Sequence, residues 1–151
     1  MNPDRRPLKF ASFDEIVPDI ERLIGGHRTV GNWTLGQICD HLAAVHRLLV
    51  DAPAPPEPSV PTPGQEEQKR RFFATGEVGE GRPMPGVLHT PAAKDAAEAA
   101  EEVRDSLAYY RAATTAPATE HPWLGPLTKD QWDQVVLIHA AHHLSFAIPT
   151  A

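Results

Sequence analysis

Cysteine, basic residues and long apolar runs are all scarce in this chain of 151 residues. Its single cysteine, Cys39, cannot form a disulfide within the chain, and such sparing use of cysteine is typical of a reducing cytoplasm. Fourteen Lys and Arg stand against 20 Asp and Glu, which leaves a formal net charge of −6. Because a surface that binds nucleic acid needs cations to neutralise phosphates, we do not expect nucleic acid as a partner.

The longest purely aliphatic run is VVLI at 135–138, far short of the roughly 20 apolar residues that cross a membrane as a helix. The start, MNPDRRPLKFASF, carries charge but no apolar segment follows it, so we expect neither secretion nor membrane insertion. Apolar residues make up 41% of the chain, enough to bury one core. These features predict a cytoplasmic protein with a single domain over 1–151.

Helix starts recur along the chain, whereas strand signals do not. Three segments match the capping box, in which Ser or Thr and a Glu or Gln three residues later satisfy free amides of a first helical turn. They are SFDE at 12–15, TLGQ at 34–37 and TKDQ at 128–131. Pro18 either kinks the first helix or lies in the first turn of a shorter one that begins near Val17. The sequence leaves both alternatives open.

A fourth helix is predicted over 90–113, with Thr90 as its N-cap and Pro91 in its first turn, because alanine and glutamate give this segment high helix propensity. The residues before it, 52–90, form a crossover rich in Pro and Gly that is too long for a tight turn. Such a crossover allows the flanking helices to run parallel, and QEEQKRRFFA at 65–74 fits a short helix inside it. We therefore expect an all-α four-helix bundle.

Three histidines occur within five positions of the apolar segment LIHAAHHLSF at 137–146. At about 100° per residue, His139 lies near the centre of the apolar stripe of Trp132, His143 about 40° beyond His139, and His142 at the edge of the stripe, roughly 60° the other way. His139 and His143 therefore form an i,i+4 pair aimed at the core, and His142 less so. A lone histidine in such a place is ordinarily a core residue with a hydrogen-bond partner. Two of them on adjacent turns favour a shared metal, since each unpartnered buried ring costs roughly 1–3 kcal/mol and rings spaced i,i+4 converge on one ligand position.

A third ligand has to come from another helix, and the segment 34–50 offers two histidines. His46 lies nearer the middle of its apolar stripe than His41, so periodicity mildly favours His46.

Three motifs, NWTLGQICDHLA at 32–43, HPWLGPLTKDQW at 121–132 and HAAHHLSF at 139–146, resemble the DinB-like superfamily of metalloenzymes, in particular one of its subfamilies of unknown function. The resemblance covers roughly 12–147 and implies a four-helix bundle with one long crossover between its second and third helices. It also implies metal ligands at His41, His139 and His143, which favours His41 over His46 and leaves His46 a structural role.

Several further residues are candidates for the neighbourhood of this site. His121 matches a His-Pro turn typical of the subfamily, so it either contributes to a pocket or stabilises the turn. Gln37, one turn before His41, is a second candidate for the pocket. A ligating ring usually donates its other N–H to an acceptor, and carboxylates on the helix over 90–113 could serve, although a solvated surface is the more ordinary place for them. These carboxylates are Glu98, Glu101 and Glu102.

Three neutral imidazoles on a divalent ion, zinc or nickel, leave its charge at +2 and a position open for water or a thiolate. The resemblance implies enzymes that use low-molecular-weight thiols, so we expect a thiol S-transferase or a hydrolase with a small-molecule substrate. We do not expect the protein to bind a membrane. The sequence allows a homodimer but does not decide the oligomeric state. The alternatives are a non-catalytic metal-binding or interaction module, favoured if Trp33, Trp123 and Trp132 fill the pocket, and a bundle without metal.

Overall fold

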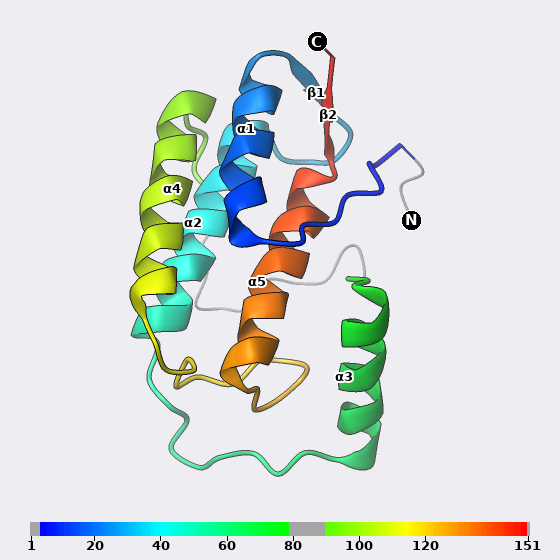
Figure 1. The fold of residues 1–151 in the computed structure, drawn as a ribbon, viewed down its shortest axis with the longest axis vertical. Helices are drawn as coiled ribbons and strands as arrows, with labels where there is room; N and C mark the ends of the chain where they lie inside the picture. The colour runs from blue at the N-terminus through cyan, green and yellow to red at the C-terminus, as the bar shows by residue number, and fades with distance from the viewer. Residues whose placement is uncertain (1–3, 79–89, 151) are drawn as a thin grey trace.

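The computed structural model describes residues 4–78 and 90–150, and in this part of the chain it is mostly helical (Figure 1). The predicted all-α class is therefore confirmed. The helices are α1 (Ile16–Ile24), α2 (Leu35–Asp51), α3 (Pro63–Thr75), α4 (Ala96–Ala112) and α5 (Lys129–Leu144), with a 3-10 turn at Phe13–Glu15 and two strands, β1 (His27–Thr29) and β2 (Ala147–Pro149).

The predicted capping boxes start helices where the sequence placed them. At α2, the Thr34 hydroxyl accepts from the Gln37 N–H at 3.2 Å, and the Gln37 side chain accepts from the Thr34 N–H at 3.0 Å. Thr128 and Gln131 form the same reciprocal pair at the start of α5, at 3.2 and 2.9 Å. The starting points of both helices that carry candidate metal ligands are thus set by local capping boxes.

The first helix is entered through the 3-10 turn rather than directly. The Ser12 N–H donates to the Glu15 carboxylate at 2.8 Å, as the predicted capping box requires, and α1 follows at Ile16. Pro18 lies in the first turn of α1, where its missing N–H has no helical acceptor to lose. The alternative of a kink in a longer helix is therefore not what occurs.

The predicted start of the helix over 90–113 is wrong by about one and a half turns. α4 begins at Ala96, and the carboxylate of Asp95 caps it by accepting from the Glu98 N–H at 3.2 Å. Residues 91–95 are not helical because α2 side chains bind the backbone of this segment. Ala92, for example, donates its N–H to Asp40 at 2.9 Å. A tertiary contact here outweighs local propensity.

Two short strands also went unpredicted. β1 and β2 pair antiparallel, with Arg28 opposite Ile148, and join the loop after α1 to the end of the chain that follows α5. Three residues in each strand are too few to show an alternating pattern in the sequence.

The crossover predicted over 52–90 contains α3, which is longer than the helix expected at 65–74; positions 79–89 lie outside the described residues. Phe72 and Phe73 pack against the core, but α3 itself contributes no fully buried residue. Figure 1 shows α3 beside α5, apart from the group formed by α1, α2 and α4.

The core lies among α1, α2, α4 and α5, each of which contributes fully buried apolar side chains such as Ile20, Leu42, Val103 and Trp132. α2 and α4 pack along their whole lengths and run parallel, because their starts meet at Gly36 and Lys94 while their ends meet in a hydrogen bond from Tyr109 to Asp51 (Figure 1). Parallel neighbours are what the long crossover allowed.

Candidate metal centre

Three histidine side chains from two helices meet at one point. The Nε2 atoms of His41 on α2 and His139 on α5 lie 3.1 Å apart, and the Nε2 atoms of His139 and His143 also lie 3.1 Å apart. One ligand atom from each of the three residues lies within 4.8 Å of the others. The i,i+4 spacing on α5 supplies two rings on adjacent turns, and α2 brings the third from 98 residues away in the sequence.

The spacing of these nitrogens fits a bound divalent ion. For zinc–nitrogen distances of about 2.0–2.1 Å, tetrahedral ligand atoms are about 3.3 Å apart, close to the two observed separations. A hydrogen bond between two imidazoles needs one N–H and one lone pair, so the single Nε2 of His139 cannot satisfy both neighbours well. An ion that accepts a lone pair from each ring removes this conflict.

The surroundings keep the rings in the neutral form that binds metals. Burial lowers the pKa of His41 to about 4, and the side chain is only 5% exposed. Burial, followed by the charges of neighbouring histidines, also lowers the pKa of His139 and of His143 well below the ordinary value. All three imidazoles are therefore unprotonated at neutral pH, while His139 and His143 keep part of their surface exposed.

Trp33 forms one wall of the centre. Its indole stacks on the ring of His143 at 5.4 Å and 23°, and lies tilted against the ring of His41 at 5.0 Å. The loop that carries it is attached to the end of α5, where the Val30 N–H donates to the Phe146 carbonyl at 2.9 Å. Trp33 thus covers one side of two candidate ligands.

The other two tryptophans named from the sequence lie elsewhere. Trp123 and Trp132 approach the ring of His121, with centroids 5.3 and 5.9 Å away. They do not fill the space around the three histidines.

His142 is turned out of the cluster, as the helical phase predicted. The guanidinium of Arg5 lies 3.1 Å from its Nδ1 and also donates to the Ser145 hydroxyl. Because a guanidinium only donates, this Nδ1 acts as the acceptor. Nothing in the sequence predicts Arg5 here, since a contact between residues 137 positions apart leaves no periodic signal.

His46 is fully buried but lies outside the cluster. Its Nδ1 is 3.0 Å from the Ser106 hydroxyl, which itself donates to the Val103 carbonyl, so the His46 Nδ1 carries the proton. Its Nε2 has no hydrogen-bond partner among the described residues. Burial, and then the charges of His41 and Arg47, lower its pKa to about 4.

Gln37 and the three glutamates are engaged away from the histidines. Gln37 caps α2 and donates to the Pro91 carbonyl at 3.3 Å. Glu98 is exposed, Glu101 pairs with Arg104, and Glu102 pairs with Lys94, which agrees with the solvated surface named as the more ordinary place for these carboxylates.

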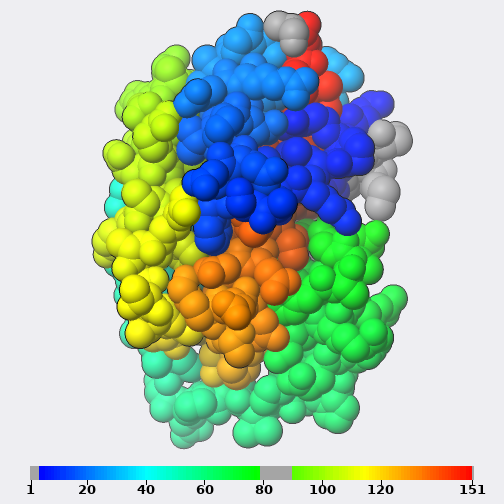
Figure 2. Space-filling view, in the orientation of Figure 1, coloured from blue at the N-terminus to red at the C-terminus, as the bar shows by residue number. Residues whose placement is uncertain are grey.

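A groove of about 1190 Å³ runs between the N-terminal segment 5–10, α3 and α5, on the face that Figure 2 shows. His121, Phe72 and His142 are among its lining residues, whereas the three clustered histidines and Gln37 are not. His121 also stabilises its own turn, because its Nδ1 accepts the N–H groups of the next turn residues at 3.2 Å. Both roles considered for His121 are thus compatible with its position.

A helical scaffold that brings three neutral imidazoles together defines a candidate centre for a divalent transition metal. The chain belongs to the family described as "Protein of unknown function (DUF1569)", whose profile matches residues 2–150. No curated protein and no solved structure matches it. Among the helices of the described part, none has the length and apolar character that crossing a membrane demands.

Proposed function

We propose that His41, His139 and His143 bind one divalent transition-metal ion, zinc or nickel, and that the protein is a metal-dependent enzyme acting on a small molecule. The observation that carries this proposal is the meeting of three Nε2 atoms from helices far apart in the sequence, with that of His139 3.1 Å from each of the other two. Imidazole nitrogen suits both metals, and three protein ligands leave room for a further one.

The architecture that accompanies this proposal is a four-helix bundle of the DinB-like type, made of α1, α2, α4 and α5 with α3 in the crossover. The shared core and the parallel course of α2 and α4 support it. The motifs at 32–43, 121–132 and 139–146 support it independently.

The reaction we propose is that of a thiol S-transferase or a hydrolase, with a low-molecular-weight thiol as the first substrate to test. A divalent ion in such a site is a Lewis acid that favours the deprotonated form of a thiol or of water. His41 holds the site from the core, while His139 and His143 are only partly buried. Cys39 does not compete, because it is buried and burial raises its pKa to about 12.

The second candidate is a non-catalytic metal-binding module. Trp33 favours it, since an indole packed against two of the three ligand rings narrows the approach to the ion.

Metal content tests the central claim. Protein purified without a His tag or chelator is expected to carry close to one zinc or nickel ion per chain in elemental analysis. A protein that holds no metal and takes up neither zinc nor nickel when they are added would contradict the proposal.

Cobalt substitution then separates the two candidates. If the ion has an open position, adding cysteine or a larger thiol should produce a sulfur-to-metal charge-transfer band, because coordination favours thiolate. Transfer of that thiol to a model electrophile should depend on the metal and should persist in Cys39→Ala. Cobalt that is indifferent to thiols and shows no metal-dependent hydrolysis would favour the non-catalytic module.

A further inference from the structure

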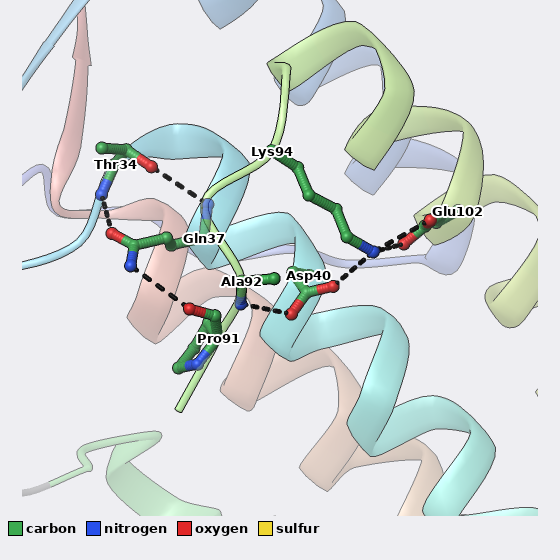
Figure 3. Close-up of polar contacts among 7 residues, drawn as sticks. All are labelled: Thr34, Gln37, Asp40, Pro91, Ala92, Lys94 and Glu102. Carbon is green, nitrogen blue, oxygen red and sulfur yellow. Dashed lines mark hydrogen bonds and ion pairs between the residues drawn. The ribbon is translucent and has the colours of Figure 1, made fainter. Parts of the chain in front are cut away.

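Residues 91–94, which we call the strap, cross the first turns of α2 before α4 begins (Figure 3). Pro91 is buried although it belongs to no helix or strand. The strap therefore packs on α2 as a fixed part of the fold.

Hydrogen bonds from successive turns of α2 hold the strap. Gln37 donates from its side-chain amide to the Pro91 carbonyl at 3.3 Å, and the Ala92 N–H donates to the Asp40 carboxylate at 2.9 Å (Figure 3). The ammonium nitrogen of Lys94, the last residue of the strap, lies 2.8 Å from a carboxylate oxygen of Asp40 and 2.8 Å from one of Glu102 on α4. Lys94 thus joins the strap and both parallel helices through one ammonium group.

A backbone contact beside these bonds admits only glycine. A Cβ placed on Gly36 would lie 2.0 Å from the carbonyl oxygen of Lys94, far inside van der Waals contact. Because the clash would be with backbone, no side-chain rotation could relieve it. The strap and the first turn of α2 therefore lie closer together than any other residue at position 36 would allow.

The charges strengthen this attachment. Partial burial alone would raise the pKa of Asp40, but the hydrogen bonds from Lys94 and from the Ala92 N–H, together with the charge of Lys94, lower it below its ordinary value. Hydrogen bonds to Asp40 and Glu102 raise the pKa of Lys94 in turn. Both partners stay ionised at neutral pH.

We propose that the strap sets the position of His41, with Lys94 as the positioning residue of the metal centre. This inference rests on the proposed metal site. Asp40 directly precedes His41, and α2 packs far more extensively on α4 than on α5, so the placement of His41 opposite the α5 histidines is fixed from the α4 side. Metal–ligand distances tolerate shifts of only about 0.2 Å, so a small displacement of α2 weakens binding.

The experiment compares zinc affinity between variants by competition with a chromophoric chelator, at a temperature where each is fully folded by circular dichroism. Lys94→Met is expected to weaken zinc binding about 10-fold or more, in the range found when groups supporting metal ligands are removed. Lys94→Arg, which keeps the charge, is expected to recover most of the loss. Gly36→Ala is a second variant expected to weaken zinc binding, because its Cβ would push α2 and the strap apart.

Arg104→Met is the matched control, because Arg104 of α4, like Lys94, joins two parts of the fold through an ion pair, here with Glu21 of α1 and away from the strap. It is expected to bind zinc like the wild type. Zinc binding by Lys94→Met equal to that of wild type or of Arg104→Met would overturn the inference while leaving the metal site intact. Absence of zinc binding by the wild type would instead contradict the proposed function itself.

The visible spectrum of bound cobalt gives a readout that stability alone would not move. A displaced His41 changes the ligand geometry, so the intensity of the cobalt bands is expected to change in Lys94→Met but not in Arg104→Met.

Discussion

Two histidines on α2 show how a candidate metal ligand differs from a core residue. His41 and His46 are both almost fully buried, yet His46 has a Ser106 hydroxyl as partner while His41 meets two imidazoles. Periodicity mildly favoured His46, because burial is what periodicity measures. Which buried ring meets others depends on the neighbouring helix. The preference for His41 came from the resemblance and not from the pattern, and it is His41 that lies beside the α5 histidines.

The ligand set can be tested residue by residue. His41→Ala, His139→Ala and His143→Ala are each expected to abolish tight metal binding, because each removes one of three converging nitrogens. Isothermal titration with zinc measures the effect. His46→Ala and His142→Ala serve as controls and should bind zinc tightly, since their rings are held by Ser106 and Arg5. Loss of binding in His142→Ala with retention in His143→Ala would reverse our assignment.

Trp33 should report metal binding directly. Nickel or cobalt bound between His41 and His143 would lie next to the indole that stacks on those rings, and such ions quench nearby fluorophores. Intrinsic fluorescence is therefore expected to fall on titration with nickel, with an end point near one equivalent. In Trp33→Phe the binding should persist while most of the quenching disappears. Undiminished quenching in that variant would place the ion nearer another tryptophan.

At the scale of elements, helix starts were predictable where the sequence alone satisfies the first turn. The Thr34 and Thr128 capping boxes start α2 and α5 as predicted. The start of α4 was not predictable, because the bonds that keep Pro91 and Ala92 out of the helix come from α2. The pairing of β1 with β2 is likewise a contact between distant segments.

The caps of α2 and α3 should differ in their effect on stability. Thr34→Ala removes a capping hydroxyl from a helix with many buried residues and is expected to cost about 1 kcal/mol, or roughly 3 °C in melting temperature. Thr62→Ala removes the equivalent bond from α3, which buries no residue fully, so α3 can fray without global unfolding. Thermal melts followed by circular dichroism make the comparison. An equal loss in both variants would mean that α3 unfolds with the core.

At the scale of the whole molecule, folding places a group of neutral histidines in a largely apolar core. The residue types and their helices were visible in the sequence, but the strength of their desolvation was not, because it depends on packing from all four core helices. The same burial that prepares the rings for a metal makes the apo fold sensitive to acid.

Acid should therefore destabilise the apo protein over a defined range. The pKa of His41 and of His46 is about 4 in the folded chain, against about 6.5 when unfolded. Between pH 6.5 and 4 the unfolded chain binds protons that the folded one excludes, so the free energy of unfolding falls by about 1.4 kcal/mol per pH unit for each such group. Above pH 6.5 these groups add no pH dependence. Urea unfolding of chelator-treated protein at several pH values measures the slope.

His46→Gln isolates one contribution and links it to the metal. It should flatten the slope of the apo protein by the share of one histidine. Zinc binds only the folded state, whose ligand rings burial keeps unprotonated, so zinc should raise the stability of either form by a similar amount from pH 7 down to about 5. Protons compete with zinc for the folded chain's own histidines only near the folded pKa of about 4, so the zinc-dependent gain should shrink there, at a lower pH than the loss of apo stability. A zinc-dependent gain that is already lost between pH 7 and about 5 would mean that the ligand rings titrate inside the fold near their ordinary pKa. A slope unchanged in His46→Gln would mean that its ring is protonated inside the fold.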